Sequence, residues 1–187
     1  MREVLPDDIK PTMVVMLHWR LVERCLREID ATFPRESGGV LMGRQRGQRE
    51  ICIDEIVGPG PNARHERYSF EPDLEWQRAR IAERYARTGG KSTYLGDWHS
   101  HPEAGHGGLS NTDRTALKTI IRAPEAQCPK PLMMIFWGAP DAWSLSAWQA
   151  RLRQRRVFGA RLEVLPLEVH SAQRSTESYF SVDMPRG

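Results

Sequence analysis

The stretch Gly96-Asp97-Trp98-His99-Ser100-His101-Pro102 follows a short apolar segment, residues 93–95. Side chains alternate along a β-strand, so His99 and His101 should project from the same face. Pro102 has no backbone N–H to donate to a ladder, which predicts the end of the strand there. This stretch therefore predicts a strand over residues 92–101 that delivers two imidazoles to one place.

A glycine-rich loop, residues 103–109, separates these histidines from Ser110 and Asp113. Ser110 is a good helix N-cap, and residues three apart share a helix face, so a helix over 110–122 would present the hydroxyl and the carboxylate together. Two nitrogen ligands and one oxygen ligand, with a fourth position open, make up a catalytic zinc site. Each fragment alone has a plainer reading, as a polar strand end or a simple cap. Their order and the connecting loop favour the metal site.

The pattern His-x-His-Pro, seven residues, then Ser-x-x-Asp resembles the signature of the JAMM (MPN-plus) metalloproteases, and every position matches. The resemblance covers about residues 10 to 150 by the order of elements. It implies a zinc ion held by His99, His101 and Asp113, and a glutamate general base upstream. Residue type alone would not separate Glu36 from Glu28 or Asp30. Glu36 is singled out by the Gly-Gly pair at 38–39 and by the resemblance.

Zinc lowers the pKa of a bound water to about 7. The resemblance implies that Glu36 takes the proton of that water without binding zinc, and that Ser110 donates to the oxyanion. Three neighbouring residues receive lesser roles. Ser100 should point to the opposite face, Asp97 should orient a neighbour of the site, and His106 should lie at the surface near substrate.

The element order predicts one mixed α/β (α+β) domain over residues 1–170, with a polar tail at 171–187. The resemblance implies the MPN/JAMM fold, a curved mixed central sheet flanked by helices, similar in outline to cytidine deaminases. Apolar spacing predicts helices at 18–32, 73–87 and 110–122, and strands at 12–17, 39–43, 51–57, 92–101, 132–137 and 143–149.

Three segments are less defined by their pattern. Residues 67–70 suggest a short strand, and residues 161–169 an edge strand. The basic segment 151–156 either continues a strand or forms a turn of helix.

Composition narrows the function. With 27 basic and 24 acidic residues the chain is only mildly basic, so we expect no nucleic-acid partner. Three scattered cysteines without Cys-x-x-Cys spacing favour a reducing compartment. The acidic, proline-containing N-terminus is unlike a signal peptide, and no apolar run would span a bilayer. We therefore expect a cytoplasmic protein with no membrane partner.

Two other zinc chemistries are disfavoured. A deaminase would show His-x-Glu and Pro-Cys-x-x-Cys, and a gluzincin His-Glu-x-x-His on a helix. The chain most resembles the bacterial JAMM peptidases that deconjugate a cGAS-like nucleotidyltransferase in CBASS anti-phage operons carrying E1- and E2-like enzymes. The alternatives are a processing peptidase for a ubiquitin-like or sulfur-carrier protein, or a silent MPN module that only binds a partner.

Such a substrate would present an extended C-terminal tail. An extended chain gains main-chain hydrogen bonds along an exposed strand edge. Segments 58–67 and 105–108 are rich in Gly, Pro or polar residues, so we expect them to flank the metal and approach the tail closely. The cut is expected at the C-terminus of the modifier.

Overall fold

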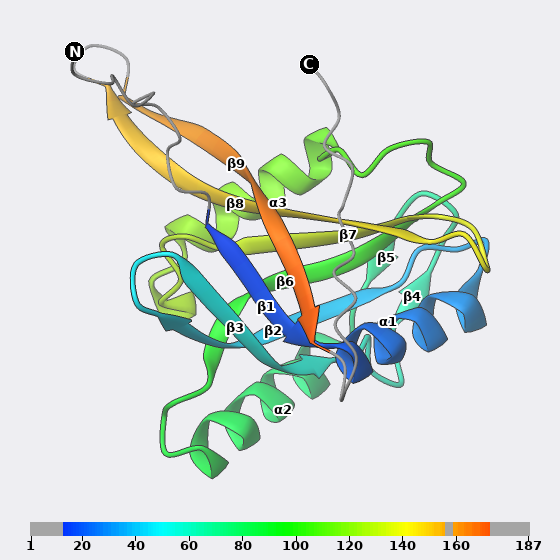
Figure 1. Cartoon of the computed structure of the whole chain (residues 1–187), viewed down its shortest axis with the longest axis horizontal. Coiled ribbons are helices and arrows are strands. Elements are labelled where there is room, and N and C mark those ends of the chain that lie inside the picture. The colour runs from blue at the N-terminus through cyan, green and yellow to red at the C-terminus, as the bar shows by residue number, and fades with distance from the viewer. Residues whose placement is uncertain (1–12, 156–158, 173–187) are drawn as a thin grey trace, which may run out of the picture.

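The computed structural model describes residues 13–155 and 159–172 as a mixed sheet with three longer helices (Figure 1). The mixed α/β class is thus confirmed, whereas the likeness to cytidine deaminases stays a prediction. The elements are β1 (Val14–His18), α1 (Trp19–Thr32), β2 (Gly38–Arg46), β3 (Glu50–Val57), β4 (Arg64–His65), β5 (Phe70–Glu71), α2 (Leu74–Arg87), β6 (Thr93–Pro102), α3 (Asn111–Arg122), the 3₁₀ turn η1 (Pro124–Ala126), β7 (Leu132–Gly138), β8 (Ser144–Arg155) and β9 (Gly159–Ala172).

The main sheet closes on itself in the order β1-β3-β2-β6-β7-β8-β9. Strand β1 pairs in parallel with β3 on one side and with β9 on the other, as Figure 1 shows. The strand predicted at residues 161–169 is confirmed as part of β9: residues 161–167 pair with β8 alone, as an edge strand would, whereas from Glu168 onward the strand pairs with β1. Strand β9 pairs with β8 and β1, and the second pairing joins Val14 to Glu168, a contact between opposite ends of the chain that local pattern cannot reveal.

Alternation along the strands divides the core into an inner and an outer layer. On β7, Leu132, Met134 and Phe136 face the inner cluster, in which α1 buries Val22, Cys25 and Ile29. On the opposite face of the same strand, Met133 and Ile135 pack against Leu117 of α3. Helix α2 covers β2 and β3 on a third cluster around Val40 and Met42. With α3 packed in this way, the face of β6 that carries His99 and His101 lies beside the start of α3.

Two further sequence predictions are corrected or refined by the structure. Residues 67–69 are the turn of a small hairpin between β4 and β5, so the short strand predicted at 67–70 was wrong except at Phe70. The basic segment continues β8 through Arg155, which excludes the helical turn for residues 151–155.

The predicted boundary between domain and tail falls close to the end of the described chain. Strand β9 runs to Ala172, and residues 1–12, 156–158 and 173–187, including most of the predicted tail and the N-terminal segment, lie outside the described residues. Within the described ranges, the helices are all too short or too polar to cross a bilayer.

Candidate metal centre

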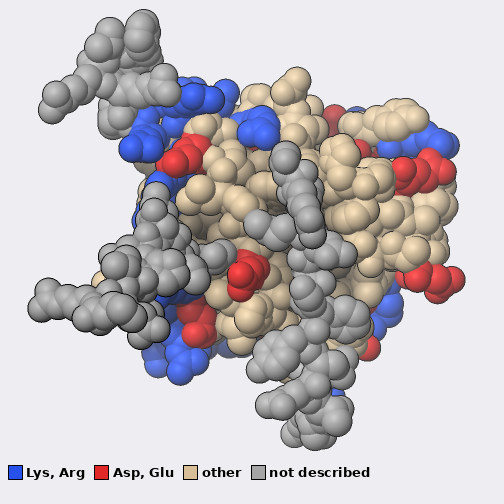
Figure 2. All heavy atoms as spheres, turned by 45° about the horizontal axis from the view of Figure 1, so that its top comes forward, with Lys and Arg blue, Asp and Glu red and all other residues tan. Residues whose placement is uncertain are grey.

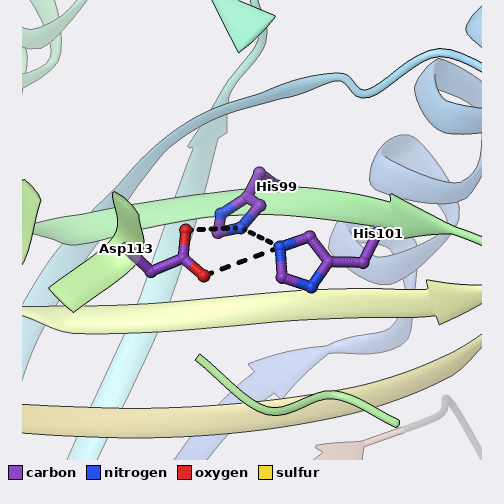
Figure 3. A group of neighbouring side chains, drawn as sticks. All are labelled: His99, His101 and Asp113. Atoms are coloured by element: carbon purple, nitrogen blue, oxygen red, sulfur yellow. Dashed lines mark hydrogen bonds and ion pairs between the residues drawn. The ribbon is translucent and has the colours of Figure 1, made fainter. Parts of the chain in front are cut away.

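Strand β6 and the first turn of α3 bring His99, His101 and Asp113 together, as the alternation and the helix spacing predicted (Figure 3). The two Nε2 atoms lie 2.9 Å apart. Nε2 of His99 is 3.2 Å from Oδ1 of Asp113, and Nε2 of His101 is 3.6 Å from Oδ2. One ligand atom from each residue thus lies within 4.8 Å of the other two.

The capping box of α3 fixes the carboxylate. The Ser110 hydroxyl accepts a hydrogen bond from the Asp113 amide at 3.1 Å, and the Asp113 carboxylate accepts from the Ser110 amide at 2.6 Å. Asp113 is only 7% exposed. Burial alone would raise its pKa, but the hydrogen bond and charge of His99 and the bonds from Ser110 together hold it below the usual range. The carboxylate is therefore ionised at neutral pH.

The other titratable groups of the site are shifted mainly by burial. Burial and the neighbouring His99 lower the pKa of His101 to about 4, so this imidazole is neutral and free to act as a ligand. Burial raises the pKa of Glu36 to about 7; His99 opposes the shift and Asp113 adds to it. The predicted base thus lies close enough to interact electrostatically with both His99 and Asp113. A pKa of about 7 suits proton transfer near neutral pH.

Glu36 reaches the site on the connection between α1 and β2. The β2–β6 ladder aligns Gly38 with His99 and Gly39 with Trp98. A Cβ atom on Gly38 would lie 2.5 Å from the Trp98 carbonyl, and one on Gly39 would collide with the Val57 carbonyl. The Gly-Gly pair is thus needed because β2 approaches its neighbouring strands closely here. This close approach explains why two glycines follow Glu36 in the sequence.

Sequence reasoning missed a contact to the backbone of Glu36. Its amide donates to the Glu66 carbonyl at 2.8 Å, and its carbonyl lies 2.9 Å from Nδ1 of His65. Both partners belong to the β4–β5 hairpin. A lone histidine in a polar loop carries no signal that would have identified it.

The three secondary residues occupy distinct places. Ser100 is buried on the opposite face, as predicted; its hydroxyl accepts from the Ser37 amide at 3.0 Å. Asp97 accepts from the Tyr94 hydroxyl at 2.8 Å, while burial raises its pKa to about 6. His106 is exposed and accepts from the Gly108 amide at 3.1 Å.

The loop before α3 is fixed to β7 and β8. The Trp148 indole donates to the Gly107 carbonyl at 2.9 Å. Gly107 is buried, and a Cβ there would collide with Ser146 and Trp137. This part of segment 105–108 is therefore held in place just before Ser110 and Asp113.

A groove of about 540 Å³ lies along α3, with Asp97 in its wall. The other lining residues all come from α3 and are Asn111, Thr112, Thr115, Ala116, Thr119 and Ile120.

The basic segment lies apart from this site, on the β8–β9 ribbon. Arg151 pairs with Glu163 at 2.7 Å and Arg153 with the same carboxylate at 3.8 Å. Figure 2 shows the blue basic side chains on this face interspersed with red acidic ones. Arg151 and Arg153 are thus partly neutralised by Glu163.

The donor set fits a divalent cation. Two imidazole nitrogens and a buried, ionised carboxylate are directed at one point (Figure 3). Imidazole and carboxylate are ligands that zinc and other transition metals accept, and three protein ligands leave a position for water or substrate.

Comparison with known proteins agrees with this geometry. The family described as prokaryotic homologs of the JAB domain matches residues 18–151. A protein of Sinorhizobium fredii named probable metalloprotease y4qB is 38% identical over 76% of this chain and 87% of its own length. A Vibrio cholerae protein named CD-NTase/cGAS isopeptidase is 32% identical over 75% of this chain and 85% of its own.

Structural comparison supports the same fold. The solution structure of protein DSY2949 from Desulfitobacterium hafniense superposes with a TM-score of 0.60 at 18% identity, covering 86% of this chain and 94% of that one. At this identity the likeness concerns the fold alone. The family match, the metalloprotease relative and the His-His-Asp group together show that this chain belongs to the prokaryotic JAB (JAMM) family of metallopeptidases.

Proposed function

We propose that the chain is a zinc isopeptidase that releases a conjugated cGAS-like nucleotidyltransferase, or a ubiquitin-like modifier, from target proteins. The observation that carries the proposal is the convergence of His99, His101 and Asp113 beside Glu36. Relatives named CD-NTase/cGAS isopeptidase, in Vibrio cholerae and at 27% identity in Escherichia coli, support the substrate class. A cytoplasmic location and E1- and E2-like partners belong to the same proposal.

Each residue has a defined task in this reaction. His99, His101 and Asp113 would hold the zinc ion, which supplies Lewis acidity and lowers the pKa of water. Glu36 takes the proton of the attacking water and passes it to the departing amine. The Ser110 hydroxyl oxygen accepts a hydrogen bond from the Asp113 amide. The hydroxyl proton therefore remains available to donate to the substrate carbonyl oxygen, which becomes negative during attack.

The substrate tail must enter extended. Every described strand of the main sheet has a neighbour on each side over at least part of its length. We expect the tail to pair with the separate β4–β5 hairpin, whose first strand lies in the predicted segment 58–67. The groove along α3 offers a second wall.

Two alternatives make different predictions. A processing peptidase would cut a precursor of a ubiquitin-like or sulfur-carrier protein but not an isopeptide conjugate. A silent module would bind conjugates and leave them intact; the complete ligand set together with Glu36 disfavours it. No nucleic-acid role is proposed, because Arg151 and Arg153 already contact Glu163.

The test uses fusions and conjugates of the nucleotidyltransferase or modifier encoded beside this gene. We expect mass spectrometry to find one cut at the C-terminus of that domain, abolished by a chelator and restored by zinc. Multiple cuts in unfolded casein, with none at the junction, would indicate a general protease and defeat the proposal. An adjacent E1/E2-like gene together with a nucleotidyltransferase gene would favour the nucleotidyltransferase as substrate.

A further inference from the structure

The β4–β5 hairpin touches the backbone of the proposed base on both sides. The Glu36 amide donates to the Glu66 carbonyl at 2.8 Å, and the Glu36 carbonyl lies 2.9 Å from Nδ1 of His65. The next residue, Ser37, forms hydrogen bonds to Ser100 of β6: its amide donates to the Ser100 hydroxyl, and its carbonyl accepts from the Ser100 amide. Glu36 is therefore held between the hairpin and β6.

The chemistry of the His65 contact fixes its proton. A carbonyl oxygen can only accept, so Nδ1 of His65 must carry the hydrogen. The ring is itself held within the hairpin, because its centroid lies 5.4 Å from that of Phe70, its partner in the β4–β5 ladder. His65 thus presents an oriented donor to the main chain of Glu36.

We propose that His65 is a positioning residue, which holds the main chain of Glu36 so that the carboxylate faces the metal centre. The inference rests on the proposed function of Glu36 and assigns His65 no contact with substrate or metal. Displacement of a reacting group by about 1 Å can cost about a hundredfold in rate. A donor that fixes the main chain of the base can therefore act on turnover without touching the reaction.

Three variants separate this role from a general effect on folding. His65→Leu removes the donor, and His65→Asn restores an N–H near the position of Nδ1. Arg80→Ala is the control outside the hairpin, since Arg80 lies on α2 and forms an exposed ion pair with Glu83 at 2.8 Å. We expect His65→Leu to lower kcat about 10- to 100-fold at unchanged metal content. His65→Asn should recover most of the loss, and Arg80→Ala should behave as wild type.

The decisive measurement is a double-mutant cycle with Glu36→Gln. If His65 acts only through Glu36, His65→Leu should change nothing in the Glu36→Gln background. The same fold loss in both backgrounds, or an unchanged kcat for His65→Leu, would overturn the proposal.

Two readouts do not depend on turnover. ¹⁵N NMR of the ring should show a proton on Nδ1 of His65. Hydrogen exchange of the Glu36 amide should be at least tenfold faster in His65→Leu and near wild type in His65→Asn. If the wild-type protein cleaves no fusion or conjugate, the proposed function fails, and these readouts still decide whether His65 holds Glu36. A proton on Nε2, or unchanged exchange, would show that it does not.

Discussion

The two sides of the proposed active centre, the ligand side and the base side, are built in opposite ways. The ligand side comes from one continuous stretch, because β6, a clamped loop and the capping box of α3 deliver His99, His101 and Asp113. The base side is assembled from separate segments, with Glu36 held between the β4–β5 hairpin and Ser100 of β6. The ligand side can therefore be recognised in the sequence, whereas the base side depends on contacts that only the folded chain brings together.

The largest effect should come from breaking the ligand side. The double substitution His99→Ala and His101→Ala removes both nitrogen donors, so we expect metal content to fall from about one zinc per chain to none and turnover to vanish. Metal analysis and the fusion assay measure this together. Zinc at wild-type stoichiometry in the double mutant would disprove the ligand assignment.

Breaking the base side should separate turnover from metal binding. Glu36→Ala should lower kcat by about 10²–10⁴-fold, because general acid–base groups contribute that much, while zinc content and the thermal midpoint stay near wild type. The variant should also retain bound conjugate in a pull-down. Near-normal cleavage would remove Glu36 from the mechanism.

Ser110 connects the two sides, since it caps α3 and is the proposed oxyanion donor. Ser110→Gly suits this question because glycine costs a cap only a few tenths of a kcal/mol but has no hydroxyl. We expect kcat to fall about 10²–10³-fold with little change in unfolding free energy. A loss of stability that accounts for the lost activity would indicate a capping role alone.

The loop that carries the ligand side should tolerate no added atom at its clamped glycine. In Gly107→Ala the new methyl group meets Trp137 and Ser146, so we expect about 1–3 kcal/mol of destabilisation in urea unfolding. Gly105→Ala in the same loop is the control, because a Cβ there meets no atom within 4 Å. Equal stability of the two variants would show that the loop is not held by this contact.

The smallest effect concerns the metal-free protein and pH. Folding raises the pKa of Glu36 from 4.5 to about 7, so its contribution to stability is present below pH 4.5 and is lost as pH rises toward 7. Glu36→Gln should flatten the unfolding free energy across this range, measured by urea titration in chelator. An unchanged slope would mean that Glu36 is not buried as described.

The sequence predicted best what depends on short-range geometry. The period of two placed His99 and His101 on one face, and the three-residue spacing of Ser110 and Asp113 became a capping box. The pairing of β1 with β9 could not be predicted, because no local pattern records which strand closes a sheet. The role of His65 was hidden for the same reason, since its partner is a main-chain carbonyl in a distant segment and not a side chain with a spacing of its own.

The parallel pairing of β1 with β9 has a consequence for biosynthesis. A ribosome extends a chain by roughly 5–20 residues per second, so after Asp113 has been made, roughly 3–12 s pass before β9 is complete. During that time the ligand stretch already exists, but β1 still lacks the neighbour that β9 will provide. Strand β8, once it has been made, lacks the same neighbour until β9 follows. Premature release of the nascent chain would leave two unprotected strands capable of pairing with other chains, so cellular quality control of this protein should act most strongly on products that lack their last strand.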